Sequence, residues 1–249
     1  MRIDIATLFP ELLENYLSES IIGRSRAKNI FEAYCHNIRD YTQDKHRRVD
    51  DTPYSERQGM LMQAEPIYRC WQSVCNMTRR QPHVIYMSPQ GKTLTQQRCK
   101  ELSQLDSIFI ICGHYEGVDN RIIEKIVDEE ISIGDYVLTG GELPALVLVD
   151  GVARMLEGTL SSSVSYTDES HFNGLLEYPQ YTRPEVWEGM AVPSVLLSGH
   201  HANIKKWRQE QALLNTLAKR PELLETAQLT DEDLAILTKL KEAKSEENT

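Results

Sequence analysis

The stretch that decides the fold is Ser132-Ile133-Gly134-Asp135-Tyr136-Val137-Leu138-Thr139-Gly140-Gly141-Glu142-Leu143-Pro144, where a loop runs into the start of an apolar helix. Gly140 and Gly141 can adopt backbone angles that are closed to other residues, and they let a ligand approach the main chain. Pro144 suits a first helical turn, in which backbone N–H groups have no partner within the helix. The stretch therefore predicts a ligand site lined by backbone, with a plain Gly-Gly turn as the alternative.

Two more loops follow apolar runs that are typical of buried strands. Residues 107–112 lead into the polar loop Gly113-His114-Tyr115-Glu116-Gly117, and residues 84–87 lead into Ser88-Pro89-Gln90-Gly91-Lys92. Open α/β sheets bind ligands in the crevice outside the carboxyl ends of their parallel strands. Each loop alone is better explained as a turn, but the three together predict one shared pocket.

The order of the expected elements indicates an α/β fold, a parallel sheet with helices on both faces. Strands are expected at 3–8, 31–38, 84–87, 107–112 and near 130–133, and helices at 10–17, 65–77, 93–105, 121–126 and 143–156. Small polar residues after Gly158 predict a linker or lid, and two further helices are expected near 202–218 and from 231 to about 243. We therefore expect an α/β domain over 1–160, a flexible linker over 161–175 and a small all-helical domain over 176–249.

Charge and composition limit the classes of partner. The 249 residues carry a formal net charge of -10, which argues against a general nucleic-acid binder and gives no reason to expect DNA as a partner. Basic residues nevertheless cluster, and either a local basic groove or solvated faces explain the two groups, Arg39, Lys45, Arg47 and Arg48, and Lys205, Lys206 and Arg208. No run is long enough for a membrane span and no secretion signal is recognised, so we expect a cytoplasmic protein without membrane contact.

Neither the cysteines nor any other cluster of residues predicts a metal site or a catalytic thiol. The 5 cysteines lack the paired close spacing of a zinc site, which favours buried free thiols. Cys112 precedes the Gly113 loop, but the pattern assigns it no partner histidine, so a packing role is preferred to a catalytic thiol. No cluster of residues indicates a metal site.

Taken together, the motifs resemble those of the bacterial tRNA (guanine-N1)-methyltransferases, which are knotted SPOUT methyltransferases. The match runs from residue 1 to about residue 220 and includes 3–10, the Gly113 and Gly140-Gly141 loops, 175–184 and 195–202. Gly-rich loops alone would be weak, since neither Gly-x-Gly-x-x-Gly nor a P-loop is present. The resemblance implies a C-terminal trefoil knot in the sheet domain, which general topology rules make improbable, and a homodimer in which the second subunit's helical domain closes the pocket.

The resemblance also implies the ligands and the residues that hold them. S-adenosyl-L-methionine is the methyl donor, tRNA the partner, and magnesium an optional helper. Tyr86 and Tyr115 have core packing as an alternative of comparable weight. The cofactor-binding residues are Tyr86, Met87, Ser88, Pro89, Gln90, Gly113, Tyr115, Glu116, Gly117, Ser132, Ile133, Gly134, Tyr136, Leu138, Gly140, Gly141 and Pro144.

The implied reaction is methyl transfer to N1 of the guanosine just after the tRNA anticodon, which maintains the reading frame. This nitrogen bears a proton at neutral pH, so the site needs a base and a positive group near the guanine O6. Arg154 matches the family's essential arginine, with an ordinary helix arginine as the alternative. Glu169 occupies the place of the family's aspartate, and a shift of one residue would present Asp168 instead.

The residues that would contact tRNA form the last implied group. They are Asp50, Gly59, Arg183, Ser198, Gly199, His201, Lys205 and Arg208. The sequence departs from the family pattern where Ser55-Glu56-Arg57 replaces a run of glycines, His114 an arginine and Gln180 a histidine. These departures weaken the tRNA assignments more than the cofactor assignments.

Two other functions stay open at this point. A binding module that keeps the pocket without catalysis is supported by Glu169 and by the altered glycines. Another α/β enzyme, such as a nucleotide hydrolase, is disfavoured by the missing P-loop. Transfer of label from S-adenosyl-L-methionine to unmodified tRNA would separate the enzyme from the binding module.

Overall fold

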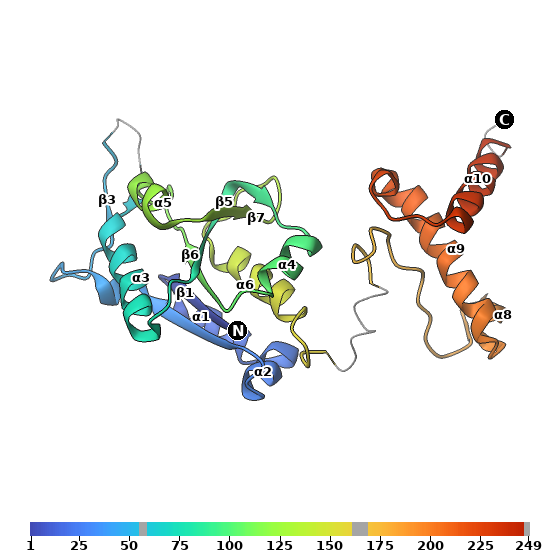
Figure 1. Ribbon diagram of the computed structural model, residues 1–249, viewed down its shortest axis with the longest axis horizontal. Helices are drawn as coiled ribbons and strands as arrows, with labels where there is room; N and C mark the ends of the chain where they lie inside the picture. Colours follow the sequence, from blue (N-terminus) through green and yellow to red (C-terminus); the bar gives the residue numbers. More distant parts are fainter. Residues whose placement is uncertain (55–58, 161–168, 247–249) are drawn as a thin grey trace. The chain divides into compact units, whose positions relative to one another are not determined.

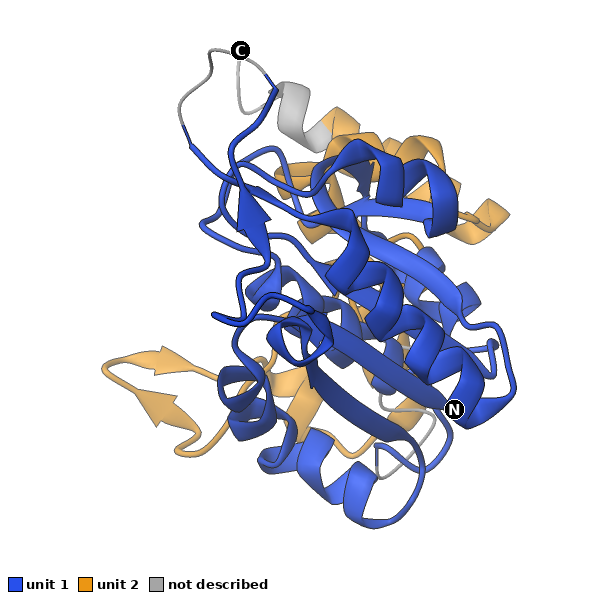
Figure 2. Cartoon of the chain, turned by 90° about the vertical axis from the view of Figure 1, so that its left-hand side faces the viewer, with its two compact units in different colours: residues 1–162 blue, residues 163–249 orange. Residues whose placement is uncertain are grey.

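The computed structural model describes residues 1–54, 59–160 and 169–246. The chain divides into two units, residues 1–162 and 163–249 (Figures 1 and 2). Asp168, Ser55-Glu56-Arg57 and residues 161–168 of the predicted linker lie outside the described residues.

Unit 1 is built on a parallel sheet of 5 strands in the order β2-β1-β6-β5-β7 (Figure 1). The strands are β1 (Arg2–Thr7), β2 (Glu32–Asn37), β5 (His83–Thr93), β6 (Ser107–Cys112) and β7 (Glu129–Ser132). Every pairing in this sheet is parallel, so all the carboxyl ends lie at one edge. The central strands are buried on both sides, which is why the sequence shows them as continuous apolar runs.

Helices cover both faces of this sheet, as the sequence predicted. They are α1 (Pro10–Leu17), α2 (Ser20–Ala27), α3 (Ala64–Thr78), α4 (Gln96–Leu102), α5 (Asn120–Ile126) and α6 (Glu142–Ala153). Alternate residues of β6 enter different cores: Ile108 and Ile110 pack with α1, α4 and α6, whereas Phe109 packs with α3 and α5. The period of two along a strand thus divides one apolar run between two cores.

Several elements of unit 1 differ from the expectation. Helix α2 was not predicted, nor were the 3-10 helix η1 (Ile38–Tyr41) and the hairpin of β3 (Asp50–Asp51) and β4 (Leu61–Met62). Strand β5 also continues past Met87, because Met87 and Lys92 both pair with Ile131. Residues 88–91 therefore form a bulge in β5, and this bulge becomes a wall of the pocket.

Unit 2 contains helices and one short hairpin. Its elements are β8 (Val186–Trp187), β9 (Met190–Ala191), α8 (Ser194–Leu197), α9 (His201–Lys219), the 3-10 helix η2 (Pro221–Glu225) and α10 (Asp231–Glu246). The prediction of an all-helical domain was wrong for the hairpin, which turns at Glu188 and Gly189 with positive φ of 49° and 81°. Strands of two residues are too short to show alternation.

The last helix begins as the sequence indicated. Thr230 Oγ1 accepts a hydrogen bond from the Asp233 backbone N–H at 3.2 Å, and the Asp233 carboxylate accepts one from the Thr230 N–H at 2.9 Å. This reciprocal capping satisfies two N–H groups at the start of α10. Among the described residues, no helix is both long and apolar enough to cross a membrane.

Candidate functional site

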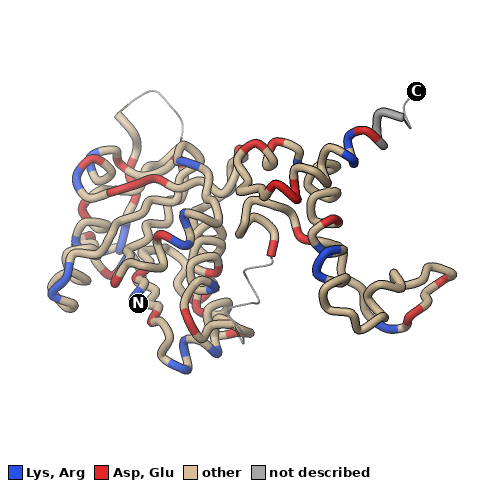
Figure 3. Tube along the Cα trace, turned by 45° about the vertical axis from the view of Figure 1, so that its right-hand side comes forward, with Lys and Arg blue, Asp and Glu red and all other residues tan. Residues whose placement is uncertain are grey.

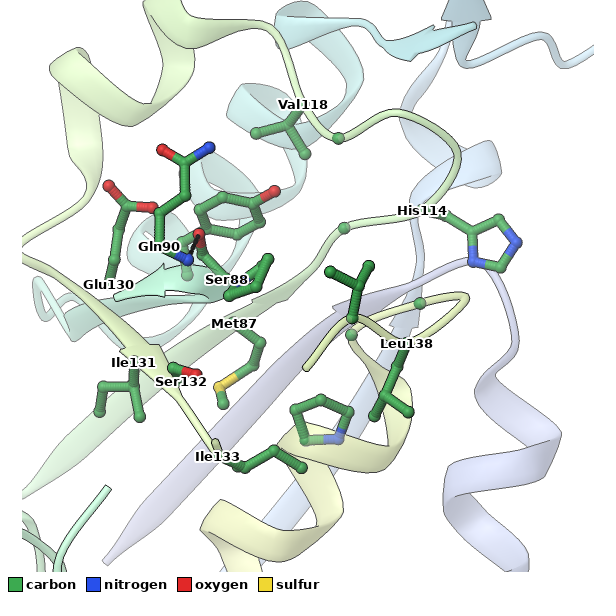
Figure 4. Close-up of a pocket in the computed structure, with 18 of the residues that line it drawn as sticks. Met87, Ser88, Gln90, His114, Val118, Glu130, Ile131, Ser132, Ile133 and Leu138 are labelled. Atoms are coloured by element: carbon green, nitrogen blue, oxygen red, sulfur yellow. Dashed lines mark hydrogen bonds between the residues drawn. The ribbon is translucent and has the colours of Figure 1, made fainter. Parts of the chain in front are cut away.

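The three predicted loops meet in one cavity of about 400 Å³ at the carboxyl edge of the sheet in unit 1 (Figure 4). Its walls are the β5 bulge, the loop after β6 and the loop between β7 and α6. All the predicted cofactor residues line it except Gly134, whose carbonyl accepts a hydrogen bond from Ser132 Oγ at 2.9 Å. Eight further lining residues were not predicted from the sequence, and most of them lie within or beside a predicted loop, whereas Ile123 lies in a predicted helix: His114, Val118, Asn120, Ile123, Glu130, Ile131, Val137 and Thr139.

Two of these loops are locked together by Gly140 and Gly141. His114 pairs with Gly140, and the Gly141 N–H donates to the Gly113 carbonyl at 2.8 Å. A Cβ atom on Gly141 would lie 2.8 Å from the Cα of Cys112, closer than side chains approach a backbone. Gly141 has an ordinary φ of -82°, and Gly140 has no positive φ either. The expectation of special backbone angles was therefore wrong: lack of space, not conformation, requires glycine here.

The walls combine apolar and acidic groups. Figure 4 shows Met87, Ile133 and Leu138 around the same space, each coming from a different loop or strand end. Glu130 also lines the cavity, as does Glu116. Burial raises the pKa of the Tyr86 phenol to about 12, so this ring stays neutral and acts by shape and as a hydrogen-bond donor. Such a pocket suits a ligand with a flat apolar part and a cationic part.

A buried carboxylate lies behind the two interlocked loops. Glu142 is 6% exposed at the start of α6, and its Oε1 accepts a hydrogen bond from Thr7 Oγ1 at 2.9 Å. The His114 Nδ1 lies 3.9 Å from Glu142 Oε2 and has no hydrogen-bond partner among the described residues. Thus Glu142 faces one group from β1 and one from the Gly113 loop.

Cys112 lies close to this carboxylate and behaves as a packing residue. Its side chain is fully buried, and burial, together with the charge of Glu142, raises the pKa of its thiol well above the ordinary value. A neutral buried thiol is a poor nucleophile. The predicted packing role of Cys112 is confirmed, since the residue belongs to the buried core that contains Ile108 and Ile110.

A segment next to the pocket carries two residues that were predicted to contact tRNA. The Glu116 N–H donates to the Met60 carbonyl at 3.0 Å, and the Met62 N–H donates to the Gly117 carbonyl at 3.0 Å. Met62 also pairs with Asp50 across the β3–β4 hairpin. A Cβ on Gly59 would lie 2.5 Å from the Cγ of Glu116. Asp50, which pairs with Met62, and Gly59, which precedes Met60, therefore lie beside the segment that is hydrogen-bonded to the pocket rim.

Comparison with known proteins agrees with this geometry. The model of the family described as tRNA (Guanine-1)-methyltransferase TrmD matches residues 1–226 of the chain. The chain belongs to this family. It is 57% identical over 223 residues to the tRNA (guanine-N(1)-)-methyltransferase of Ruminiclostridium cellulolyticum, covering 90% of this chain and 96% of the relative. The protein of the same name from Desulforamulus reducens is 50% identical over 241 residues, covering 96% of this chain and 95% of the relative.

The other residues that the sequence assigned to the tRNA methyltransferase site are not among those that line the pocket of unit 1. Arg154 caps the C-terminus of α6, about 15 Å along the helix axis from Pro144, and does not line the cavity. Glu169 and Arg183 belong to unit 2. So do five exposed residues at and before the start of α9, Ser198, Gly199, His201, Lys205 and Arg208. The predicted catalytic, cofactor-binding and tRNA-binding residues are therefore divided between the two units.

Metal binding finds no support in this member of the tRNA methyltransferase family. Within residues 1–54, 59–160 and 169–246, no group of three or more His, Cys, Asp or Glu side chains is arranged to hold an ion.

Proposed function

We propose that the chain transfers the methyl group of S-adenosyl-L-methionine to N1 of the guanosine that follows the anticodon in tRNA, a modification that maintains the reading frame. The names of the relatives support this reaction. The observation that carries it is the single cavity into which three separate loops bring nearly all the expected cofactor residues.

The residues of the cavity fit this cofactor. A volume of about 400 Å³ is in the range of small-molecule sites. Ile133 and Leu138 offer an apolar surface to adenine, whereas Glu116 and Glu130 offer negative charge to the sulfonium and the amino group. When bound, S-adenosyl-L-methionine supplies an electrophilic methyl group. The loops of unit 1 bind and orient this group and exclude water from it.

A carboxylate and an arginine complete the chemistry. As N1 of guanine gains the methyl group, its proton passes to Glu169 or Asp168, and Arg154 stabilises the negative charge that moves to O6. Glu169→Gln and Asp168→Asn made separately identify the base, because only loss of the base lowers kcat strongly. Equal retention of activity in both variants would reject the assignment.

We further propose that the active species is a homodimer, because Arg154 lies too far from the pocket of its own chain. Large apolar side chains are exposed on α1 and α6, among them Leu12 at 47% and Leu143 at 57%. Tyr16 joins the two helices through its hydroxyl, which donates to Asp150 Oδ2 at 2.7 Å. A two-fold axis that pairs the α6 helices antiparallel would bury this face and bring Arg154 of one copy toward the Pro144 end of the other.

Complementation between two inactive variants tests this arrangement. Arg154→Ala removes the arginine, and Leu138→Trp fills the pocket of its own chain. A mixed dimer has one complete site, so it should recover about half the activity of a wild-type dimer. The matched control places both substitutions in one chain and mixes it with wild type, which leaves no complete site in the mixed dimer. Absence of recovery in the first mixture would reject the shared site.

The remaining features of the family extend the proposal. The His114–Gly140 pairing, where the two loops meet, supports a SPOUT trefoil knot in the sheet domain over 1–160. Exposed cations on α9 support tRNA binding by the domain over 176–249, with 161–175 as the linker. Because tRNA is the substrate, we place the activity in the cytoplasm.

Labelled cofactor provides the test of the reaction. Purified protein, labelled S-adenosyl-L-methionine and unmodified tRNA with guanosine after the anticodon should yield label at N1. The control tRNA has adenosine at that position and should remain unlabelled. Cofactor binding without any transfer would overturn the proposal and leave a binding module.

A further inference from the structure

A loop at the pocket edge of the sheet carries four basic residues that the proposed reaction does not use. We call residues 39–48, with Arg39, Lys45, Arg47 and Arg48, the basic loop. It follows β2 and begins within η1, so it leaves the same edge of the parallel sheet as the three cofactor loops. Ile38 and Val49 anchor its two ends and are 0% exposed. In Figure 3, blue segments gather at its tip.

The basic loop is held in shape by its own acidic residues. Asp44 Oδ1 accepts hydrogen bonds from the His46 N–H at 2.8 Å and the Arg48 N–H at 3.2 Å, which lower the pKa of Asp44. Arg47 has a positive φ of 58° and forms an ion pair with Asp40. Both acids are therefore engaged within the loop.

The remaining cations point outward. Lys45 and Arg48 are exposed, and within the described part of the chain no carboxylate forms an ion pair with either side chain, although the charge of Arg48 contributes to the lowered pKa of Asp44. A rigid loop that presents unpaired cations loses little conformational entropy when it binds an anion.

One side chain connects the basic loop to the pocket. Arg39 Nη1 donates to the Arg47 carbonyl at 3.5 Å, and Arg39 Nη2 donates to the Tyr115 hydroxyl at 3.5 Å. Tyr115 itself lines the cavity and is 43% exposed. An anion on the basic loop would thus lie next to the entrance of the cofactor pocket.

We propose that the basic loop binds the sugar–phosphate backbone of the tRNA close to the guanosine that is methylated. This inference rests on the proposed function. A chain with a net charge of -10 and two glutamates in the pocket repels RNA, so backbone contact needs cations at the rim. Phosphate contacts fix the position of the strand, whereas the pocket selects the base.

The opposite edge of the same sheet provides a matched control. Lys28 precedes β2 and Arg80 precedes β5, so both lie near the amino ends of the strands. Both are exposed, and Arg80 has only a long surface contact of 3.9 Å with Asp106. Removing these two charges changes the net charge as much as removing Lys45 and Arg48 does.

The test measures tRNA affinity at several KCl concentrations for wild type, Lys45→Gln/Arg48→Gln and Lys28→Gln/Arg80→Gln. Loss of two phosphate contacts should reduce the slope of log K against log [KCl] by about 1.4 to 1.8 and weaken binding roughly 25- to 60-fold at 0.1 M. The control pair should keep the wild-type slope, and calorimetry should show unchanged S-adenosyl-L-methionine affinity in both.

Two results would overturn the inference. A wild-type slope in Lys45→Gln/Arg48→Gln means that the basic loop touches no phosphate. An equal loss of slope in both pairs means that the cations act only through the general field of the protein. Because binding is measured rather than turnover, either result is distinct from a failure of the methylation assay.

Discussion

Replacing Gly141 by alanine should separate the two interlocked cofactor loops. The new Cβ would lie 2.8 Å from the Cα of Cys112 and 2.9 Å from the N of Gly113. Both neighbours are backbone atoms, so no side-chain rotation can relieve the contact. Ordinary van der Waals contact begins at 3.4 Å, so the two segments must move apart by about 0.6 Å.

This displacement of about 0.6 Å determines how much stability and how much cofactor affinity Gly141→Ala should lose. The hydrogen bond from the Gly141 N–H to the Gly113 carbonyl would lengthen from 2.8 Å to about 3.4 Å, beyond good geometry. Its loss costs about 1 kcal/mol. Displacement of the cofactor-binding backbone weakens ligand contacts as well, so we expect S-adenosyl-L-methionine to bind at least about 10-fold more weakly.

Isothermal titration calorimetry with S-adenosyl-L-methionine measures this loss directly. Gly189→Ala is the control for binding, because a Cβ there meets nothing within 4 Å and the residue lies in the β8–β9 turn of unit 2; its positive φ of 81° makes alanine strained, so this variant loses some stability but no ligand contact. That variant should bind like wild type. Wild-type affinity in a folded Gly141→Ala would refute the argument that lack of space requires glycine at this position.

Three further predictions concern single side chains. Glu142→Gln keeps the shape of the residue but removes the charge that faces Thr7 and His114, so the cofactor Kd should rise about 5-fold by calorimetry; an unchanged Kd would contradict this. Burial alone would raise the pKa of Glu129, but hydrogen bonds from His83 and Arg98 lower it to about 2. Since the unfolded value is about 4.3, the carboxylate stabilises the fold above that pH and this stability is lost as pH falls toward 2. Urea unfolding of Glu129→Gln should therefore show a loss of up to roughly 3 kcal/mol at pH 7 and a smaller difference from wild type at pH 3, whereas a constant difference would refute the linkage. Leu148→Ala, at a position 1% exposed in α6, should lower the free energy of unfolding by about 2 to 5 kcal/mol in the same assay, and a loss below 1 kcal/mol would show that the core repacks.

The sequence predicted the elements in which apolar residues form a continuous run or recur with the period of a helix. Strand β6 and helix α1 have the expected bounds of 107–112 and 10–17, because a buried strand and an amphipathic helix each show their period within a few residues. Helix α2 was missed, since only Ile22 and Ser25 of its 8 residues are buried and no apolar stripe appears. Elements supported mainly by tertiary contacts leave no such pattern.

Parts of the pocket could not be predicted from the sequence for the same reason, because tertiary contacts determine them. Pro89 and Gly91 argue against a strand, yet β5 continues through them, because the sheet accommodates a bulge opposite Ile131. The grouping of three loops followed from the expectation that the carboxyl ends of parallel strands lie at one edge, whereas His114 and Glu130 were missed as lining residues. The separation of about 15 Å between Pro144 and Arg154 follows from the helix expected over 143–156, yet the resemblance assigned both residues to one site.

The backbone ladder between residues 60–62 and 116–119 has one more consequence. Backbone hydrogen bonds of 3.0 Å from Glu116 to Met60 and from Met62 to Gly117 join the segment proposed to contact tRNA to the segment proposed to bind the methyl donor. Because these hydrogen bonds join the two segments, a displacement of residues 60–62 should displace residues 116–119 by a similar amount, and the reverse. Under the proposed assignments, binding of either ligand should therefore change the affinity for the other by the same factor, and the order of binding can be measured.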